Sequence, residues 1–213
     1  FSHAARYLDF LRSPSRKLDD LQGVSVVLAF FENSTRTRFS FDIAAKRLSA
    51  EVTTFQAAGS SVSKGESLLD TVRNIEAMHV DVLVMRHPSS GAPVFLRDRI
   101  GSSIINAGDG WHQHPTQGLL DAFTLYRHCP SLKGLKVCIV GDVLHSRVAR
   151  SNISILRTLG AEVAVCGPGT LIPAGIEALG VRRFRRFDEA LEWADVVNVL
   201  RIQMERMQQG LLP

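Results

Sequence analysis

Long apolar runs are missing from this sequence of 213 residues. No stretch approaches the roughly 20 residues that a membrane-spanning helix needs, so we expect no membrane partner. The first eleven residues mix His3, Arg6 and Asp9 with apolar side chains, which does not fit a secretion signal. Hydrophobic residues make up 45% of the chain and charged residues 22%. This composition predicts a soluble globular protein with one large domain or two small ones, and we expect it to be cytoplasmic.

Cysteine is also scarce, with only Cys129, Cys138 and Cys166. Their odd number, apolar surroundings and lack of metal-type spacing do not fit a disulfide framework or a zinc site. We therefore predict three buried free thiols in a reducing compartment.

Positive charge is in modest excess, at +4. The only dense basic run is residues 182–186 (RRFRR), which is short and matches no nucleic-acid-binding motif. We favour a solvated strand face for this run and expect no nucleic-acid partner. A positive balance also suits an enzyme of anionic substrates, because a cleft lined with Arg and Lys attracts anions.

Short β-branched runs alternate with helical patterns along the chain. Strands are predicted at 24–30, 51–56, 81–85, 103–107, 135–140, 161–166 and 195–200. Helices are predicted at 37–48, 66–79, 93–99, 115–127 and 147–159. This alternation predicts an α/β fold with two doubly wound parallel sheets. The pattern resets near residue 130, which predicts a first domain at 1–130 and a second, C-terminally incomplete domain at 131–213.

The segment 31–39 (FENSTRTRF) stands where a predicted strand meets a predicted helix. Hydroxyls and backbone N–H groups at a helix start form a natural phosphate site, and Arg36 adds a bidentate grip. A plain helix cap is the alternative, but a single Ser or Thr suffices for a cap. The hydroxyls of Ser34, Thr35 and Thr37, together with two arginines, exceed that need and favour an anion site.

Two further segments carry a basic residue in a suitable place. The polar loop 59–66 contains Lys64, although a plain surface loop explains this segment when it is taken alone. Arg86 follows a predicted strand, and ligands of open parallel sheets gather at the carboxyl ends of strands. Service to a helix dipole or a salt bridge is an equal alternative for Arg86.

Two segments invite a metal or cofactor interpretation. His112 and His114 form an H-x-H pair, but nothing nearby offers a convincing third and fourth ligand, so we expect no metal. A histidine that donates to a substrate carbonyl fits this place better. The segment 141–147 (GDVLHSR) follows a predicted strand but lacks the G-x-G-x-x-G turn, so dinucleotide binding is poorly supported and we expect no cofactor.

Two motifs together carry a family resemblance. STRTR at 34–38 and HPTQ at 114–117 resemble the signatures of the carbamoyltransferase superfamily. Further segments are similar to the aspartate carbamoyltransferases within it: KGE at 64–66, MRHP at 85–88, GD at 141–142, HSR at 145–147 and RIQ at 201–203. Ornithine enzymes usually carry FRG in place of MRH and HPCQ in place of HPTQ. The resemblance covers essentially the whole chain, in the right order.

The resemblance implies a transferase of pyrimidine biosynthesis. It would move the carbamoyl group of carbamoyl phosphate to the amine of L-aspartate, without a covalent intermediate. The implied carbamoyl phosphate site comprises Ser34, Thr35, Arg36, Thr37, Ser60, Arg86, His114 and Gln117. The implied aspartate site comprises Lys64, Arg147, Arg201 and Gln203. The implied catalytic residues are Arg36, Thr37, Lys64, Arg86 and His114.

The resemblance also implies an assembly. Ser60 and Lys64 look like loop residues that a neighbouring subunit of a homotrimer inserts into the active site. A larger assembly with regulatory chains or other pyrimidine enzymes stays open. The family has an additional C-terminal stretch, with a substrate loop and a final helix, that this sequence lacks.

Three alternatives stay open. A carbamoyltransferase for ornithine or a related amine is the nearest, although such a substrate calls for acidic partners where Arg201 stands. A catalytically silent homologue that serves as a scaffold is the second, but no site residue is lost among those present. A nicotinamide-dependent oxidoreductase is the third, and the missing glycine fingerprint disfavours it.

Overall fold

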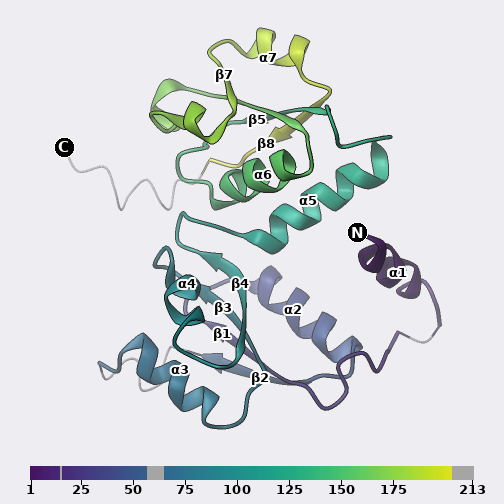
Figure 1. The fold of residues 1–213 in the computed structure, drawn as a ribbon, viewed down its shortest axis with the longest axis vertical. Coiled ribbons are helices and arrows are strands. Elements are labelled where there is room, and N and C mark those ends of the chain that lie inside the picture. The colour runs from purple at the N-terminus through teal and green to yellow at the C-terminus, as the bar shows by residue number, and fades with distance from the viewer. Residues whose placement is uncertain (15, 57–64, 203–213) are drawn as a thin grey trace. The chain divides into compact units, whose positions relative to one another are not determined.

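The computed structural model describes residues 1–14, 16–56 and 65–202. The chain divides into two compact units, residues 1–110 and 111–213. Each unit contains a four-stranded sheet in which every pairing is parallel (Figure 1). The predicted α/β fold with two parallel sheets is confirmed.

The first unit alternates strands with helices. Its elements are α1 (Ser2–Phe10), β1 (Ser25–Phe30), α2 (Thr35–Arg47), β2 (Glu51–Gln56), α3 (Leu68–Glu76), β3 (Val82–His87), α4 (Ala92–Arg97) and β4 (Ser103–Asp109). The strand order is β2-β1-β3-β4. The chain therefore leaves β1 toward one edge of the sheet and later returns to β3 on its other side, which places the topological switch point between β1 and β3.

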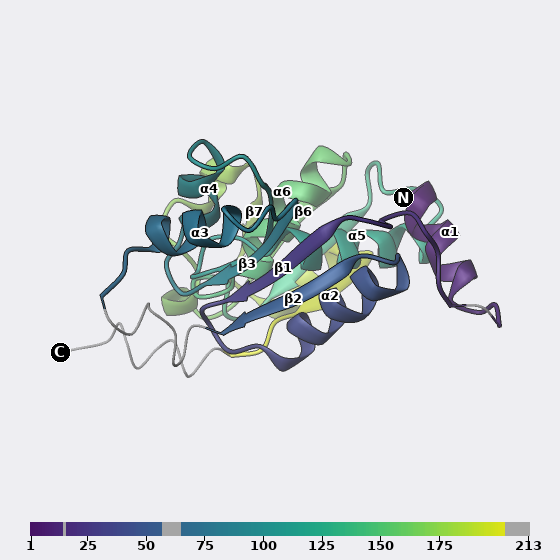
Figure 2. The same ribbon diagram turned by 90° about the horizontal axis from the view of Figure 1, so that it is seen from below.

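Both faces of this sheet are covered, which explains why its central strands are continuously apolar. Val27 and Ala29 of β1 face a core that includes Val72 and Ile75 of α3. Residues of alternate parity in β1 face a second core, with Ala45 of α2. Accordingly, α3 and α4 lie on one face of the sheet and α2 on the other (Figure 2).

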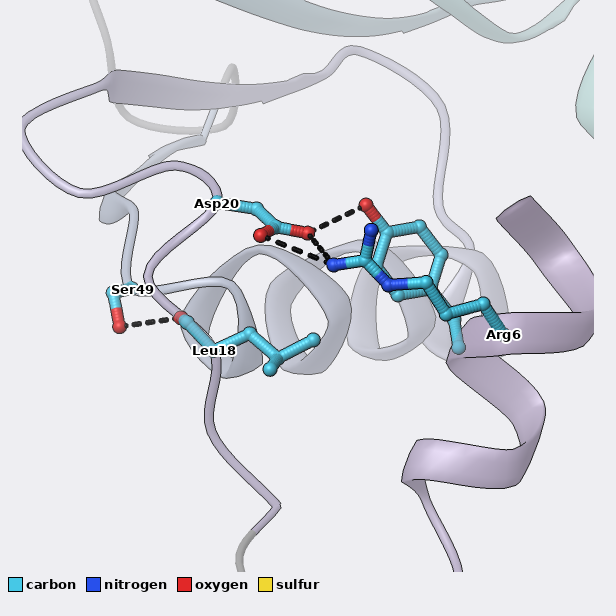
Figure 3. Close-up of polar contacts among 5 residues, drawn as sticks. Arg6, Leu18, Asp20 and Ser49 are labelled. Carbon is cyan, nitrogen blue, oxygen red and sulfur yellow. Dashed lines mark hydrogen bonds and ion pairs between the residues drawn. The ribbon is translucent and has the colours of Figure 1, made fainter.

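Helix α1 was not predicted from the sequence. It is joined to the segment before β1 by polar contacts (Figure 3). Arg6 forms a salt bridge of 3.2 Å with Asp20, and the hydroxyl of Tyr7 donates to the same carboxylate at 2.8 Å. Ser49, at the end of α2, donates to the carbonyl of Leu18 at 2.7 Å. These contacts are exposed or half-buried, so they orient α1 and the segment before β1 more than they stabilise the fold.

The second unit begins with a helix and then alternates. Its elements are α5 (Pro115–His128), β5 (Lys136–Val140), α6 (Arg147–Thr158), β6 (Glu162–Cys166), the 3₁₀ turns η2 (Gly169–Leu171) and η3 (Ile176–Leu179), β7 (Arg182–Phe184), α7 (Phe187–Trp193) and β8 (Val196–Val199). The strand order β7-β6-β5-β8 places the second switch point between β5 and β8.

Helix α5 packs closely against α6. Gly118 makes this approach possible: a Cβ there would stand 2.7 Å from Cδ1 of Ile155 and 3.0 Å from Cβ of Ser151. The close packing assigns α5 to the second unit. The two compact units divide between Gly110 and Trp111, and the domain boundary near residue 130 stays a prediction.

Two of the three cysteines are buried as predicted, and the basic run is partly exposed as predicted. Cys138 and Cys166 are buried free thiols, but Cys129 is only half-buried because it lies at the exposed end of α5. Part of the basic run forms β7, the edge strand of the second sheet, with Arg182, Arg185 and Arg186 exposed. Among the described residues, no helix is both long and apolar enough to cross a membrane.

Candidate functional site: two switch points that gather cations

The carboxyl ends of β1 and β3 meet at the first switch point. Phe30 pairs with Arg86 in the register of these two strands. The N–H of Phe31 donates to the carbonyl of Arg86 at 2.8 Å. The segment that leads into α2 therefore begins beside Arg86, at the edge where open parallel sheets bind ligands.

The start of α2 has the character of an anion site. Ser34 is the N-cap, with extended backbone angles, yet no capping hydrogen bond to its side chain is formed within the described chain. Thr35 and Arg36 are exposed, and the first turn contains no acidic residue. Cations at the positive end of a helix are unfavourable by themselves, whereas an anion there is stabilised. The turn is thus complementary to a phosphate.

Arg86 is held in a fixed position at the same edge. Its side chain is only 9% exposed and forms a salt bridge of 2.9 Å with Glu32. Its Nη1 donates to the carbonyl of Ala107 at 3.2 Å. Because a guanidinium is planar and presents several donors, two fixed contacts set the direction of the rest of the group.

His87 follows Arg86 and has a lowered pKa. Burial lowers its pKa, and its Nδ1 accepts a hydrogen bond of 2.9 Å from the N–H of Ser89. Its ring lies 5.2 Å from that of Phe31. The site's positive charge in this unit therefore comes from arginine and not from this histidine.

The start of α5 carries the predicted carbonyl donor. His114 is the N-cap of α5 and is 8% exposed. Its backbone N–H donates to the hydroxyl of Ser151 in α6 at 2.8 Å, and that hydroxyl donates in turn to the side chain of Gln113. One turn further on, the amide of Gln117 donates to Asp121 at 2.9 Å. Both predicted residues are thus positioned by α6 or by their own helix.

The two arginines predicted to hold aspartate follow the two strands of the second switch point. Arg147 is the first residue of α6 and is 4% exposed. Arg201 follows β8 and is exposed. The two strand ends lie in contact, since the N–H of Leu200 donates to the carbonyl of Val140 at 2.8 Å. Gly141 permits this approach with a φ of +120°, because a Cβ there would stand 3.1 Å from the carbonyl oxygen of Leu200.

A buried pair supports the turn before α6. Nδ1 of His145 lies 2.8 Å from Oδ1 of Asp142, which is fully buried. The backbone N–H of His145 donates to the same oxygen at 3.1 Å. Trp111 packs edge-on against the imidazole, with ring centroids 5.1 Å apart. Ser146 then caps α6 by accepting from the N–H of Ala149.

The predicted residues fall into three groups. Unit 1 contains five of them, all near the carboxyl ends of β1 and β3: Ser34, Thr35, Arg36, Thr37 and Arg86. Unit 2 contains His114, Gln117, Arg147 and Arg201. Ser60, Lys64 and Gln203 lie outside the described residues. Within the described ranges, no cluster of three or more His, Cys, Asp or Glu residues has metal-binding geometry.

Sequence reasoning missed the supporting carboxylates. Glu32 orients Arg86, and Asp142 orients His145. Asp109, fully buried at the end of β4, accepts from the N–H of Gly91 at 2.7 Å. Asp109 is the last residue of its strand, and Glu32 and Asp142 each lie two residues after one. A carboxylate at the carboxyl end of a strand is the signal that could have revealed them.

A family model described as "Aspartate/ornithine carbamoyltransferase, carbamoyl-P binding domain" matches residues 1–127. The chain belongs to this carbamoyltransferase family. A relative from Gemmatimonas aurantiaca, named aspartate carbamoyltransferase catalytic subunit, is 59% identical over 93% of this chain and 62% of its own length. A relative of the same name from Flavobacterium psychrophilum is 54% identical over the whole chain and 69% of its own length. This carbamoyltransferase chain spans 62% to 65% of the length of the first two relatives.

Solved carbamoyltransferase structures have the same fold. An aspartate transcarbamoylase from Trypanosoma cruzi, in complex with aspartate and phosphate, superposes with a TM-score of 0.85 at 32% identity, over 96% of this chain and 71% of that one. The catalytic subunit of the M. jannaschii enzyme gives a TM-score of 0.82 at 38% identity, over 98% of this chain and 71% of that one.

Proposed function

We propose that this protein transfers the carbamoyl group of carbamoyl phosphate to the amine of L-aspartate, giving N-carbamoyl-L-aspartate and phosphate in de novo pyrimidine biosynthesis. Relatives at 53% to 60% identity carry the name aspartate carbamoyltransferase catalytic subunit. Trypanosoma cruzi structures with the same fold contain carbamoyl phosphate in one case and N-(phosphonacetyl)-L-aspartic acid in another. These similarities support the proposed substrates.

The observation that carries the proposal is the start of α2. Three hydroxyls, backbone N–H groups and Arg36 lie at the start of a helix with no acidic residue in its first turn. In the proposed complex, Ser34, Thr35, Arg36 and Thr37 hold the phosphate. Arg86, oriented by Glu32, bridges the phosphate and the carbonyl oxygen. Several charge-assisted hydrogen bonds to one dianion account for tight and oriented binding.

Catalysis in this proposal is positioning plus stabilisation of an oxyanion. The amine of aspartate attacks the carbamoyl carbon, which forms a C–N bond and moves the carbonyl electron pair onto oxygen. Thr37, Arg86 and His114 donate hydrogen bonds to that oxygen, and these bonds strengthen as its charge grows. Gln117 orients the carbamoyl nitrogen. The intermediate then collapses, breaks the C–O bond to phosphate and restores the carbonyl.

The second switch point supplies the partner for the other anion. Arg147 holds the α-carboxylate of aspartate and Arg201 the β-carboxylate, with Gln203 assisting. Two anions repel each other, so holding both at attack distance requires cations on both sides, and the gain is one of proximity. The departing phosphate, with a second pKa of about 6, accepts the amine proton. No side-chain base is assigned.

The reaction itself is tested by phosphate release. Purified full protein should release one phosphate per carbamoyl-aspartate formed, and only when both carbamoyl phosphate and L-aspartate are present. Phosphate release that proceeds at the same rate without aspartate would show hydrolysis in place of transfer.

We also propose a cytoplasmic homotrimer with shared active sites, in which Ser60 and Lys64 of one subunit complete the site of the next. Regulatory chains or other pyrimidine enzymes are proposed further partners. The resemblance to the family supports these statements. A trimer of Arg36→Ala chains and a trimer of Lys64→Ala chains should each be nearly inactive.

Mixed trimers of the two variants test the sharing. If sites are shared, some interfaces pair an intact Arg36 with an intact Lys64 from the neighbouring chain, and activity returns in proportion to their number. Mixed trimers that stay as inactive as their parents would show that the loop acts within its own chain.

A further inference from the structure

A cationic pocket lies in unit 2, and its lining includes none of the residues proposed for catalysis. Its volume is about 580 Å³, within the range typical of small-molecule sites. One wall is a face of α6 with Arg150, Ser154 and Arg157, and the other walls come from His112–Gln113 and from Ala178–Leu179 of η3. Neither His114 nor Arg147 lines it.

The lining is positively charged without a compensating acid. Two guanidiniums and an imidazole face the pocket, and none of its lining residues is acidic. Glu177 neighbours the lining residue Ala178 but does not line the pocket itself. Within the described part of the chain, neither Arg150 nor Arg157 forms an ion pair. A concave surface lined by one sign of charge concentrates counter-ions.

Arg150 gives a specific reason to expect a ligand. Its Nε is buried, and among the described residues it has no hydrogen-bond partner. A buried charged donor without an acceptor is unfavourable. Because Arg150 lines the pocket, an anion bound there would give its guanidinium an acceptor. Arg157 is better fixed, because its Nη1 donates to the carbonyl of Leu179 and its guanidinium lies against Gly180.

The spacing of the two arginines indicates the kind of anion. Arg150 and Arg157 are seven residues apart on α6, which separates their Cα atoms by about 10 Å at 1.5 Å per residue. One compact anion cannot use both positions equally, whereas a chain of phosphate groups can. Guanidinium groups bind phosphate oxygens with paired N–H donors. The hydroxyl of Ser154, between the two arginines on the same face, adds a neutral donor.

We propose that this pocket binds a small polyanion with at least two linked phosphate groups, at a site distinct from the one proposed for carbamoyl phosphate. The inference does not depend on the proposed reaction. It stands on unit 2 alone, so a protein that lacked carbamoyl transfer could still contain this site.

Isothermal titration with tripolyphosphate tests the proposal on the full protein carrying Arg36→Ala, which weakens the anion site at α2 and so lowers its share of the signal. We expect one site per chain, with orthophosphate binding at least tenfold more weakly. Adding Arg150→Gln should weaken tripolyphosphate binding at least tenfold. Arg150 is the residue to replace because its Nε has no hydrogen-bond partner among the described residues. Removing that Nε therefore breaks no described hydrogen bond.

Arg186→Gln is the matched control, because it removes the same charge from the same unit at an exposed position outside the pocket. This control should bind within about twofold of the Arg36→Ala parent. Equal weakening by Arg186→Gln and Arg150→Gln would show unspecific attraction and overturn the proposal. Absence of tripolyphosphate binding in the Arg36→Ala parent would overturn it as well. Circular dichroism melting of each variant confirms that it is folded.

Discussion

Replacing Arg36 with alanine separates binding from stability at the start of α2. Arg36 is exposed, and within the described chain it forms no hydrogen bond or ion pair. Its removal therefore breaks no described internal contact. It also takes a cation away from the positive end of a helix, which is worth about 0.3 to 1 kcal/mol. The free energy of unfolding should thus stay the same or rise slightly.

Binding of carbamoyl phosphate should respond in the opposite direction. Loss of a charged hydrogen-bond partner to a desolvated anion costs about 2 to 5 kcal/mol. At 1.4 kcal/mol per factor of ten, the Kd should rise by about 30-fold to about 4,000-fold. Because Arg36 is exposed before the ligand binds, we expect the lower part of that range. Isothermal titration of the full protein with carbamoyl phosphate measures the change, and urea unfolding measures stability.

Arg47→Ala is the matched control. Arg47 lies in the last turn of the same helix, carries the same charge and interacts favourably with the negative helix end. Its loss should slightly lower the free energy of unfolding and leave carbamoyl phosphate affinity unchanged. If Arg36→Ala binds like the unmodified protein, the anion site at α2 is refuted. If both variants lose affinity equally, net charge and not the helix start explains binding.

Three further predictions concern single side chains. His114→Ala should lower kcat by about 10²-fold to 10³-fold with little change in KM, because the hydrogen bond from His114 strengthens as the oxyanion forms. A large rise in KM at constant kcat in steady-state kinetics would show that His114 contributes to substrate binding alone. Burial lowers the pKa of His87 in the folded protein, so the unfolded chain binds a proton at this imidazole more readily than the folded chain does. The free energy of unfolding should therefore decrease as the pH falls below 6.5. His87→Asn keeps an acceptor for Ser89, so urea unfolding from pH 7.5 to 5 should show a shallower loss, and equal slopes would contradict this. Burial raises the pKa of Cys138 to about 11, so a thiol reagent at pH 8 should modify half-buried Cys129 first; equal rates in the folded protein would argue against this burial.

The regular elements could be predicted because local pattern and tertiary environment agree in them. The strand predicted at 24–30 is found at Ser25–Phe30, and the helix predicted at 147–159 is found at Arg147–Thr158. Buried parallel strands are continuously apolar, and amphipathic helices repeat every three or four residues. Helix α1 was missed because His3, Arg6 and Asp9 interrupt its apolar residues and none of its residues is buried.

In the candidate site, too, some features could be predicted from local sequence and others depend on tertiary contacts. The start of α2 was predictable, since strand, hydroxyl cluster and helix are contiguous in the sequence. The orientation of Arg86 was not, because Glu32 lies 54 residues away and meets it only through the register of β1 and β3. Likewise, the link from His114 to Ser151 depends on the packing of α5 on α6, which Gly118 permits and which no local pattern indicates.

The amine specificity of the full protein distinguishes transfer to aspartate from transfer to ornithine. Carbamoyl phosphate labelled in its carbonyl carbon is supplied with equal concentrations of L-aspartate and L-ornithine, and the products are separated by chromatography. Because Arg147 and Arg201 stand at the second switch point, we expect the label in N-carbamoyl-L-aspartate, with no detectable citrulline. Label in citrulline, or in neither product while carbamoyl phosphate remains bound, would contradict the claim that these arginines select a second anion for carbamoyl transfer.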